Sequence, residues 1–123
     1  VQIAVSSWTA EALKGTMPAS VFSRSTECHN QDKVSMGTIA ARDCVRVLEL
    51  SEQVAAACLL ANVQALRIRV KTGVVADAKV ANVRDLVDQV SQNFEFLAAD
   101  RPLEGDLRAT LARIRDRFWR VRP

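Results

Sequence analysis

The sequence has no tyrosine, one histidine, and few aromatic residues of any kind. His29 stands alone, and no serine lies in a Gly-x-Ser-x-Gly turn, so neither pattern for a nucleophilic triad is present. Gly-x-Gly-x-x-Gly and Walker sequences are also missing, which argues against the common phosphate-binding loops. The standard catalytic templates therefore do not describe this chain.

Cysteine is scarce and unpatterned. Cys28, Cys44 and Cys58 show no Cys-x-x-Cys spacing, and no second histidine accompanies His29. This favours reduced thiols in a cytoplasmic protein over a disulfide or a metal site. We assign the three cysteines to packing and predict no metal.

No long hydrophobic run is present. The most apolar stretch, Val54 to Leu66, is too short to cross a membrane and is interrupted by Asn62 and Gln64. It predicts a buried helix of a soluble protein, with no membrane partner. The net charge is only +3, and the 123 residues suit one globular unit or part of one. Because the chain begins at Val1 without methionine, we expect a fragment or a processed product.

Proline and glycine are nearly absent from the middle of the chain, which predicts one long helix over 35–72. Asp32 or Ser35 suits its N-cap, and Gly73 its C-terminal end. At 1.5 Å per residue this helix would be roughly 55 Å long. A helix over 1–15 and a polar loop over 16–34 precede it.

Two further helices are predicted from apolar residues spaced alternately three and four apart. One seam predicts a helix over 76–99, the other a helix over 103–120, with Pro102 as the break between them. The seams are Val80, Val83, Val87, Val90, Phe94 and Leu97, then Leu107, Leu111, Ile114, Phe118 and Val121. No alternating strand pattern occurs, so the fold class is all-α, a bundle of long helices in a single helical fragment over 1–123.

Arginines concentrate at the C-terminal end. Residues 101–123 hold seven arginines and three acidic residues, a balance of +4. A basic helix of this kind could bind nucleic acid. The arginines mostly fall outside the apolar seam, however, as on any solvated face, so we predict no nucleic-acid partner.

The polar run "STECHNQDKVSMG", residues 25–37, directly precedes the long helix. A helix N-terminus carries partial positive charge and free N–H groups, so it favours an anion nearby. Asn30 and Gln31 offer amide groups that could orient a carboxylate or an amine. Taken alone, these residues indicate either a helix cap or part of a site.

"HNQDKVSMGTIAARDCVRVLEL" closely resembles the aromatic amino-acid ammonia-lyase and aminomutase family. The likeness begins at "MPASVFSRSTECHNQDKVSMG" and continues more weakly through "LLANVQALRIR" and "DRPLEGD". Within the family it is greatest to bacterial tyrosine 2,3-aminomutases, which convert L-tyrosine to β-tyrosine. The resemblance implies an aromatic amino-acid substrate and a C-terminal position of this chain in a longer enzyme.

The resemblance also implies roles for single residues. Glu27 matches a glutamate near the substrate amino group, and Asn30 an asparagine near the substrate carboxylate and the electrophile. Gln31 stands where histidine-specific members carry glutamate, which argues against a histidine ammonia-lyase. His29 and Lys33 are expected to be structural or solvent-facing.

Members of this family use a 4-methylidene-imidazol-5-one electrophile formed from an internal Ala-Ser-Gly, and a tyrosine base. This sequence contains neither Ala-Ser-Gly nor tyrosine, so we expect both from another segment and the isolated chain to be inactive. Homotetramers are also implied. A phenylalanine or tyrosine ammonia-lyase, a non-enzymatic helical oligomerisation module and a basic binding domain remain the alternatives.

Overall fold

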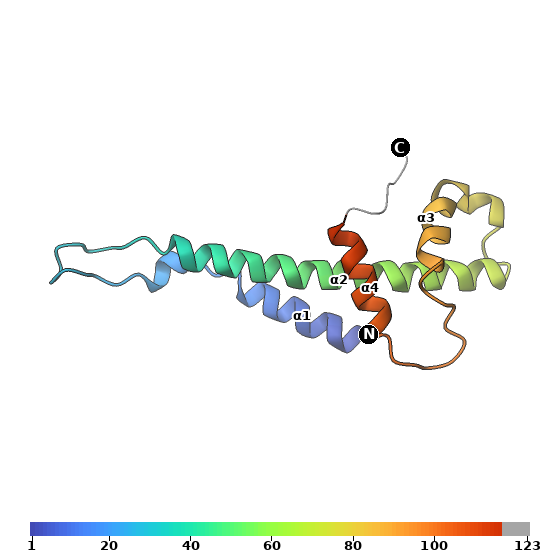
Figure 1. Cartoon of the computed structure of the whole chain (residues 1–123), viewed down its shortest axis with the longest axis horizontal. Helices are drawn as coiled ribbons and strands as arrows, with labels where there is room; N and C mark the ends of the chain where they lie inside the picture. Colours follow the sequence, from blue (N-terminus) through green and yellow to red (C-terminus); the bar gives the residue numbers. More distant parts are fainter. Residues whose placement is uncertain (117–123) are drawn as a thin grey trace. The chain divides into compact units, whose positions relative to one another are not determined.

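The computed structural model describes residues 1–116, without the side chains of Asp77 and Ala78. It contains four α-helices: α1 (Gln2–Lys14), α2 (Gly37–Lys71), α3 (Ala81–Ser91) and α4 (Glu104–Arg115) (Figure 1). Two short 3-10 helices, η1 (Ala19–Phe22) and η2 (Asp77–Val80), lie between them. No extended strand occurs in residues 1–116, which confirms the all-α class.

The chain divides into two compact units, Val1–Ser51 and Glu52–Pro123, and α2 contributes to both. The sequence-based expectation of one helical fragment over the whole chain stays a prediction.

Helix α2 has signals at both ends. At its start the Ser35 hydroxyl accepts a hydrogen bond from Gly37 N at 3.3 Å, so Ser35 rather than Asp32 caps it. At its end Gly73 adopts φ +75°, a conformation in which a side chain would be strained. Val74 N then donates to Arg69 O and Gly73 N to Val70 O, both at 3.0 Å. These two bonds form a Schellman motif, which confirms Gly73 as the predicted stop.

In the first unit, α1 runs beside the first part of α2 (Figure 1). A Cβ on Gly15 would come within 2.8 Å of the Val47 side chain, so the close approach of the two segments requires glycine there. An ion pair of 2.8 Å joins Arg46 to Glu11. The hydrogen bond from Arg46 holds the pKa of the Glu11 carboxyl below its usual value.

The core of the second unit forms where α2 meets α3 and the segment after it. Leu60 and Val63 of α2 are buried against Val90 and Phe94. Six half-buried apolar residues surround them: Leu59, Leu86, Val87, Leu97, Leu103 and Leu107. The apolar stretch from Val54 to Leu66 thus supplies a buried helix face, as predicted. Within the described residues, no helix combines the length and the apolar character needed to cross a membrane.

The helix predicted over 76–99 is shorter than expected. It begins with η2, and α3 ends at Ser91, although Phe94 is buried and Leu97 half-buried as the seam requires. The reason is that side chains of α2 supply partners for the backbone beyond Ser91. Gln64 pairs with both backbone groups of Leu97, and Arg67 donates to Phe94 O at 3.1 Å. The backbone can therefore leave the helix without losing its hydrogen bonds.

Helix α4 follows Pro102, the predicted break, and Glu104 and Asp106 lie in its first turn. It is described as far as Arg115, so Phe118 and Val121 of the predicted seam lie outside the described residues.

The assignment of the cysteines to packing is wrong. The three cysteines are free thiols, but all are exposed rather than packed in a core.

Candidate functional site

The polar loop ahead of α2 is closed at its base by one buried serine. The Ser23 hydroxyl donates to Val34 O at 3.0 Å and accepts from Val34 N at 2.9 Å. Only 7% of Ser23 is exposed. One side chain therefore joins the two ends of a segment that reaches from residue 23 to residue 34.

The tip of the loop is closed a second time by backbone. Thr26 N donates to Gln31 O at 3.0 Å, and Gln31 N donates to Thr26 O at 3.2 Å. Inside this bridge Asn30 N donates to Glu27 O at 3.0 Å, which closes a tight turn. The tip is thus a short hairpin, and the polar loop predicted over 16–34 contains both this hairpin and η1.

The turn requires an unusual backbone. Glu27, Cys28 and His29 all have positive φ, at 54°, 54° and 69°. For residues with a side chain this left-handed conformation costs roughly 1–2 kcal/mol each. The bridge and the Ser23 hydrogen bonds hold the loop in this shape against that cost. Such clustering of strain is typical of functional sites.

The structure brings Glu27, Asn30 and Gln31 together in this tip. Asn30 Nδ2 lies 3.5 Å from Glu27 Oε2, and Thr26 Oγ1 donates to Gln31 Oε1 at 3.2 Å. All three side chains are exposed. Their contact with a substrate stays a prediction.

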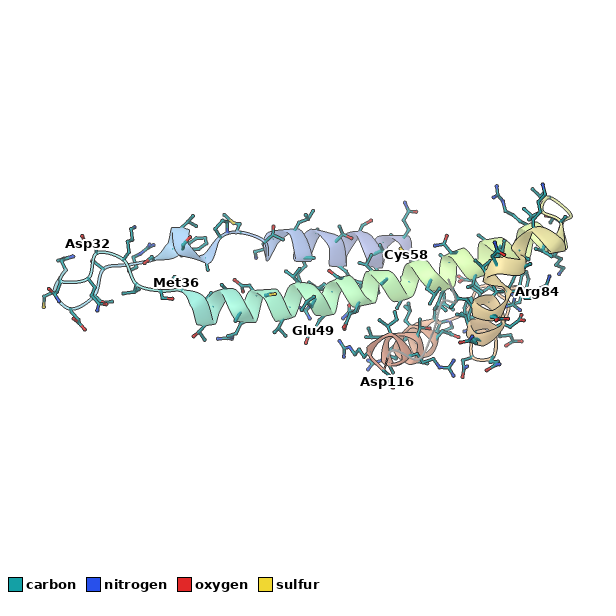
Figure 2. All side chains as sticks on the ribbon, turned by 90° about the horizontal axis from the view of Figure 1, so that it is seen from above. Asp32, Met36, Glu49, Cys58, Arg84 and Asp116 are labelled. Atoms are coloured by element: carbon teal, nitrogen blue, oxygen red, sulfur yellow. The ribbon has the colours of Figure 1, made fainter. Side chains whose placement is uncertain are left out.

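The neighbouring polar residues behave as structural or solvated groups. His29 Nδ1 lies 2.7 Å from Ser25 Oγ, a contact that links the two sides of the tip. Asp32 and Lys33 are exposed, and Figure 2 shows Asp32 in the loop beyond the end of α2 at which Met36 lies. Through the part of the chain described, no group of three or more His, Cys, Asp or Glu residues could hold a metal ion.

The chemistry that this tip offers is polar recognition. A carboxylate can pair with an ammonium group, and two amides can donate to a carboxylate. The three residues therefore suit the two charged groups of a free amino acid.

Sequence reasoning missed the residues that shape the loop. Ser23 and Thr26 hold it closed, yet serine and threonine are common in loops, and nothing in their spacing marks them. A pairing between residues 23 and 34 becomes visible only when the chain is folded. Only the symmetry of the pairs is regular: residues 23 and 34, like residues 26 and 31, lie at equal distances from the turn.

The structure is that of an all-α protein in which a polar loop precedes a long helix. Comparison with known proteins then shows the family. Residues 1–91 match the family model described as aromatic amino acid lyase. The chain is 35% identical over 108 residues to a tyrosine ammonia-lyase of Cereibacter sphaeroides, covering 88% of this chain and 20% of that protein.

Two other ammonia-lyases are similar to the chain. A tyrosine ammonia-lyase of Cupriavidus metallidurans is 37% identical, over 80% of this chain and 18% of its own length. A histidine ammonia-lyase of Caenorhabditis elegans is 34% identical, over 97% of this chain and 17% of its own length. No solved structure matches the chain. The chain belongs to the aromatic amino acid lyase family, and it spans about a fifth of the length of these relatives.

Proposed function

We propose that this chain is a segment of an enzyme that acts on an aromatic L-amino acid, with L-tyrosine as the first candidate. Family membership supports ammonia elimination, and two of the relatives are tyrosine ammonia-lyases. The likeness to tyrosine 2,3-aminomutases favours one further step, in which ammonia re-adds at the β-carbon to give β-tyrosine. A phenylalanine or tyrosine ammonia-lyase that stops at elimination is the second candidate.

One observation carries the proposal: the hairpin tip presents Glu27, Asn30 and Gln31 as one exposed set. Glu27 would hold the substrate ammonium group. Asn30 and Gln31 would orient the substrate carboxylate by donating from their amide nitrogens. Binding both charged groups fixes the α- and β-carbons relative to the protein, which lowers the entropic part of the barrier.

The 4-methylidene-imidazol-5-one group would come from another segment, because this sequence has no Ala-Ser-Gly. When bound, that group supplies an electrophile for the substrate amine. The residues of this chain fit a supporting role. The tip offers a carboxylate and two amides, and the proposed reaction requires no nucleophile from the tip. Their task is to bind and orient the substrate.

Incubation of the complete polypeptide that carries this segment with L-tyrosine, L-phenylalanine and L-histidine tests the proposal. We expect 4-coumarate or β-tyrosine from L-tyrosine, measured by chromatography. β-Tyrosine supports an aminomutase, and 4-coumarate alone supports a lyase. Conversion of L-histidine in preference to L-tyrosine would contradict the role given to Gln31. The isolated 123-residue chain should form none of these products.

We further propose that the complete enzyme is a cytoplasmic homotetramer built on these helices. Exposed apolar side chains on the first unit support this, because they favour burial in an interface. They include Ile3 at 88% exposed and Leu13, Val45 and Leu48 at 57% or more. Sedimentation should find the complete enzyme as a tetramer and the isolated chain self-associated. A stable monomer in both cases would contradict this assembly.

A further inference from the structure

A second feature lies in the unit Glu52–Pro123, which does not contain the hairpin. A cavity of about 510 Å³ opens there, lined by residues of α2, η2, α3 and the segment after α3. Its size falls in the range of small-molecule sites, about 300–1,000 Å³.

Two helices line the cavity with residues in helical register. From α2 come two pairs, Leu66 with Val70 and Arg67 with Lys71; the members of each pair are four residues apart and so lie one turn above each other. From η2 and α3 come Val80, Arg84, Val87 and Asp88, and Figure 2 labels Arg84 on α3. The lining therefore combines aliphatic side chains with three cations and one carboxylate.

Two of the cations lie over the ring of Phe96. The Arg67 guanidinium carbon lies 5.2 Å from the centroid of its ring, and the Lys71 ammonium nitrogen lies 5.0 Å from it. Both distances are those of cation–π contacts. Arg67 is held in place because it also donates to Phe94 O at 3.1 Å. The ring and both charges thus lie together at the cavity.

We propose that this cavity binds a small carboxylate with an apolar, preferably aromatic, body. Arg67 and Lys71 would receive the carboxylate, since a guanidinium and an ammonium both form charge-assisted hydrogen bonds with it. The half-buried Leu66, Val70 and Val87 would contact the body, and an aromatic body can meet the edge of the Phe96 ring. Asp88 disfavours a doubly charged group such as phosphate.

This site is separate from the amino-acid chemistry proposed for the hairpin. It uses no residue of that loop. The assignment does not depend on the catalytic proposal.

Calorimetric titration of the 123-residue chain with 3-phenylpropanoate tests the proposal. Three further probes separate the contributions: 3-phenylpropanamide has the body without the charge, acetate has the charge without the body, and inorganic phosphate is a bare anion. We expect saturable binding of 3-phenylpropanoate and binding at least about tenfold weaker for each of the others, as for loss of a charge-assisted hydrogen bond or of the apolar contact.

The variant Lys71→Met should weaken the binding of 3-phenylpropanoate by about tenfold or more. Lys79→Met is the matched control, because Lys79 is exposed and does not line the cavity; it should stay within about twofold. Asn30→Ala should leave this binding unchanged. If it abolishes binding instead, the ligand occupies the hairpin and the cavity proposal is overturned.

Other results overturn it as well. They are equal affinities for the carboxylate and the amide, equal effects of Lys71→Met and Lys79→Met, equal binding of inorganic phosphate, and no saturation by the folded chain. Circular dichroism checks the fold of each variant. If Lys71→Met loses helix, two other measurements test the proposal: the affinity of Phe96→Leu for 3-phenylpropanoate, and the comparison of 3-phenylpropanoate with 3-phenylpropanamide on the unaltered chain.

Discussion

The hydroxyl of Ser23 binds both backbone groups of Val34, at 3.0 Å to the carbonyl oxygen and 2.9 Å from the amide nitrogen. Gln64 holds Leu97 in the same manner in the other unit, donating from Nε2 at 3.0 Å and accepting at Oε1 at 3.2 Å. In each case a single polar side chain replaces secondary structure as the partner of the backbone. The shape of the hairpin and the early end of α3 both follow from such pairs.

Ser23→Ala should lower the free energy of unfolding by about 1–2 kcal/mol, because it leaves both groups of Val34 without their partner. Thermal and urea denaturation measure this. Ser20→Ala is the control, since Ser20 is exposed in η1 and should change little. Equal effects of the two variants would show that the hairpin base contributes nothing specific.

Gln64→Ala should cost about 1–3 kcal/mol, because the half-buried amide and carbonyl of Leu97 lose both hydrogen bonds. Gln92→Ala, at an exposed position just after α3, serves as the comparison and should be nearly neutral. Amide hydrogen exchange gives a second measurement. Protection of Leu97 N–H should fall in the Gln64 variant and persist in the Gln92 variant.

Cys28 tests the left-handed backbone at the tip. Cys28→Gly should be neutral or slightly stabilising, because glycine adopts φ +54° without steric cost. Cys28→Val should be destabilising by about 1 kcal/mol or more, because a β-branched side chain is the least tolerant of positive φ. The exposed position makes other causes small. The same stability for both variants would mean that the turn is not strained.

The proposed site is tested in the complete polypeptide. Asn30→Ala and Gln31→Ala should each lower kcat/KM, because a hydrogen bond to a charged group contributes roughly 1.5–3 kcal/mol, which is about ten- to more than a hundredfold. Asn30→Ala should have the larger effect, since the family resemblance implies that Asn30 lies nearer the electrophile. Lys33→Ala, at an exposed position, should change little.

Folding must be unchanged in all three variants, as judged by circular dichroism and by the mass of the assembly. If both amide variants keep full activity while Lys33→Ala abolishes it, the hairpin is only a helix cap and the assigned roles are wrong.

Acid stability depends on a further pair. Arg101 Nη1 and Nη2 donate to the two carboxylate oxygens of Asp106, at 2.6 and 3.2 Å. These hydrogen bonds hold the pKa of Asp106 below its usual value. The pair therefore stabilises the fold above the unfolded pKa of about 3.9, and this stability is lost as the pH falls through the lower folded value.

Asp106→Asn should lower the stability at pH 7 and reduce the loss of stability between about pH 5 and pH 2. Denaturation at a series of pH values measures both. Glu104→Gln is the control, because Glu104 pairs with Arg108 on an exposed face and should leave the acid limb nearly unchanged. If the stability of the Asp106 variant falls as steeply with decreasing pH as that of the unaltered chain, other groups cause the acid sensitivity.

Local sequence determined the helices and their ends where the signals lie within a few residues of each other. Gly73 ends α2 because only glycine adopts its backbone conformation easily, and the lack of proline lets α2 run unbroken from Gly37 to Lys71. The apolar seam also identified Val90 and Phe94 as core. The likeness of the polar run to one family was visible at this level and agrees with the family comparison.

Tertiary structure decided what depends on residues far apart in the chain. A seam with helical spacing predicts a helix through Leu97, but Gln64, 33 positions earlier, offers the backbone a better alternative. The hairpin likewise depends on Ser23 meeting Val34 across 11 positions. The cavity beside Phe96 needs α2 and α3 to face each other. Local propensity cannot encode these pairings, because each becomes favourable only after the chain has brought both partners together and the loop-closure entropy has been overcome.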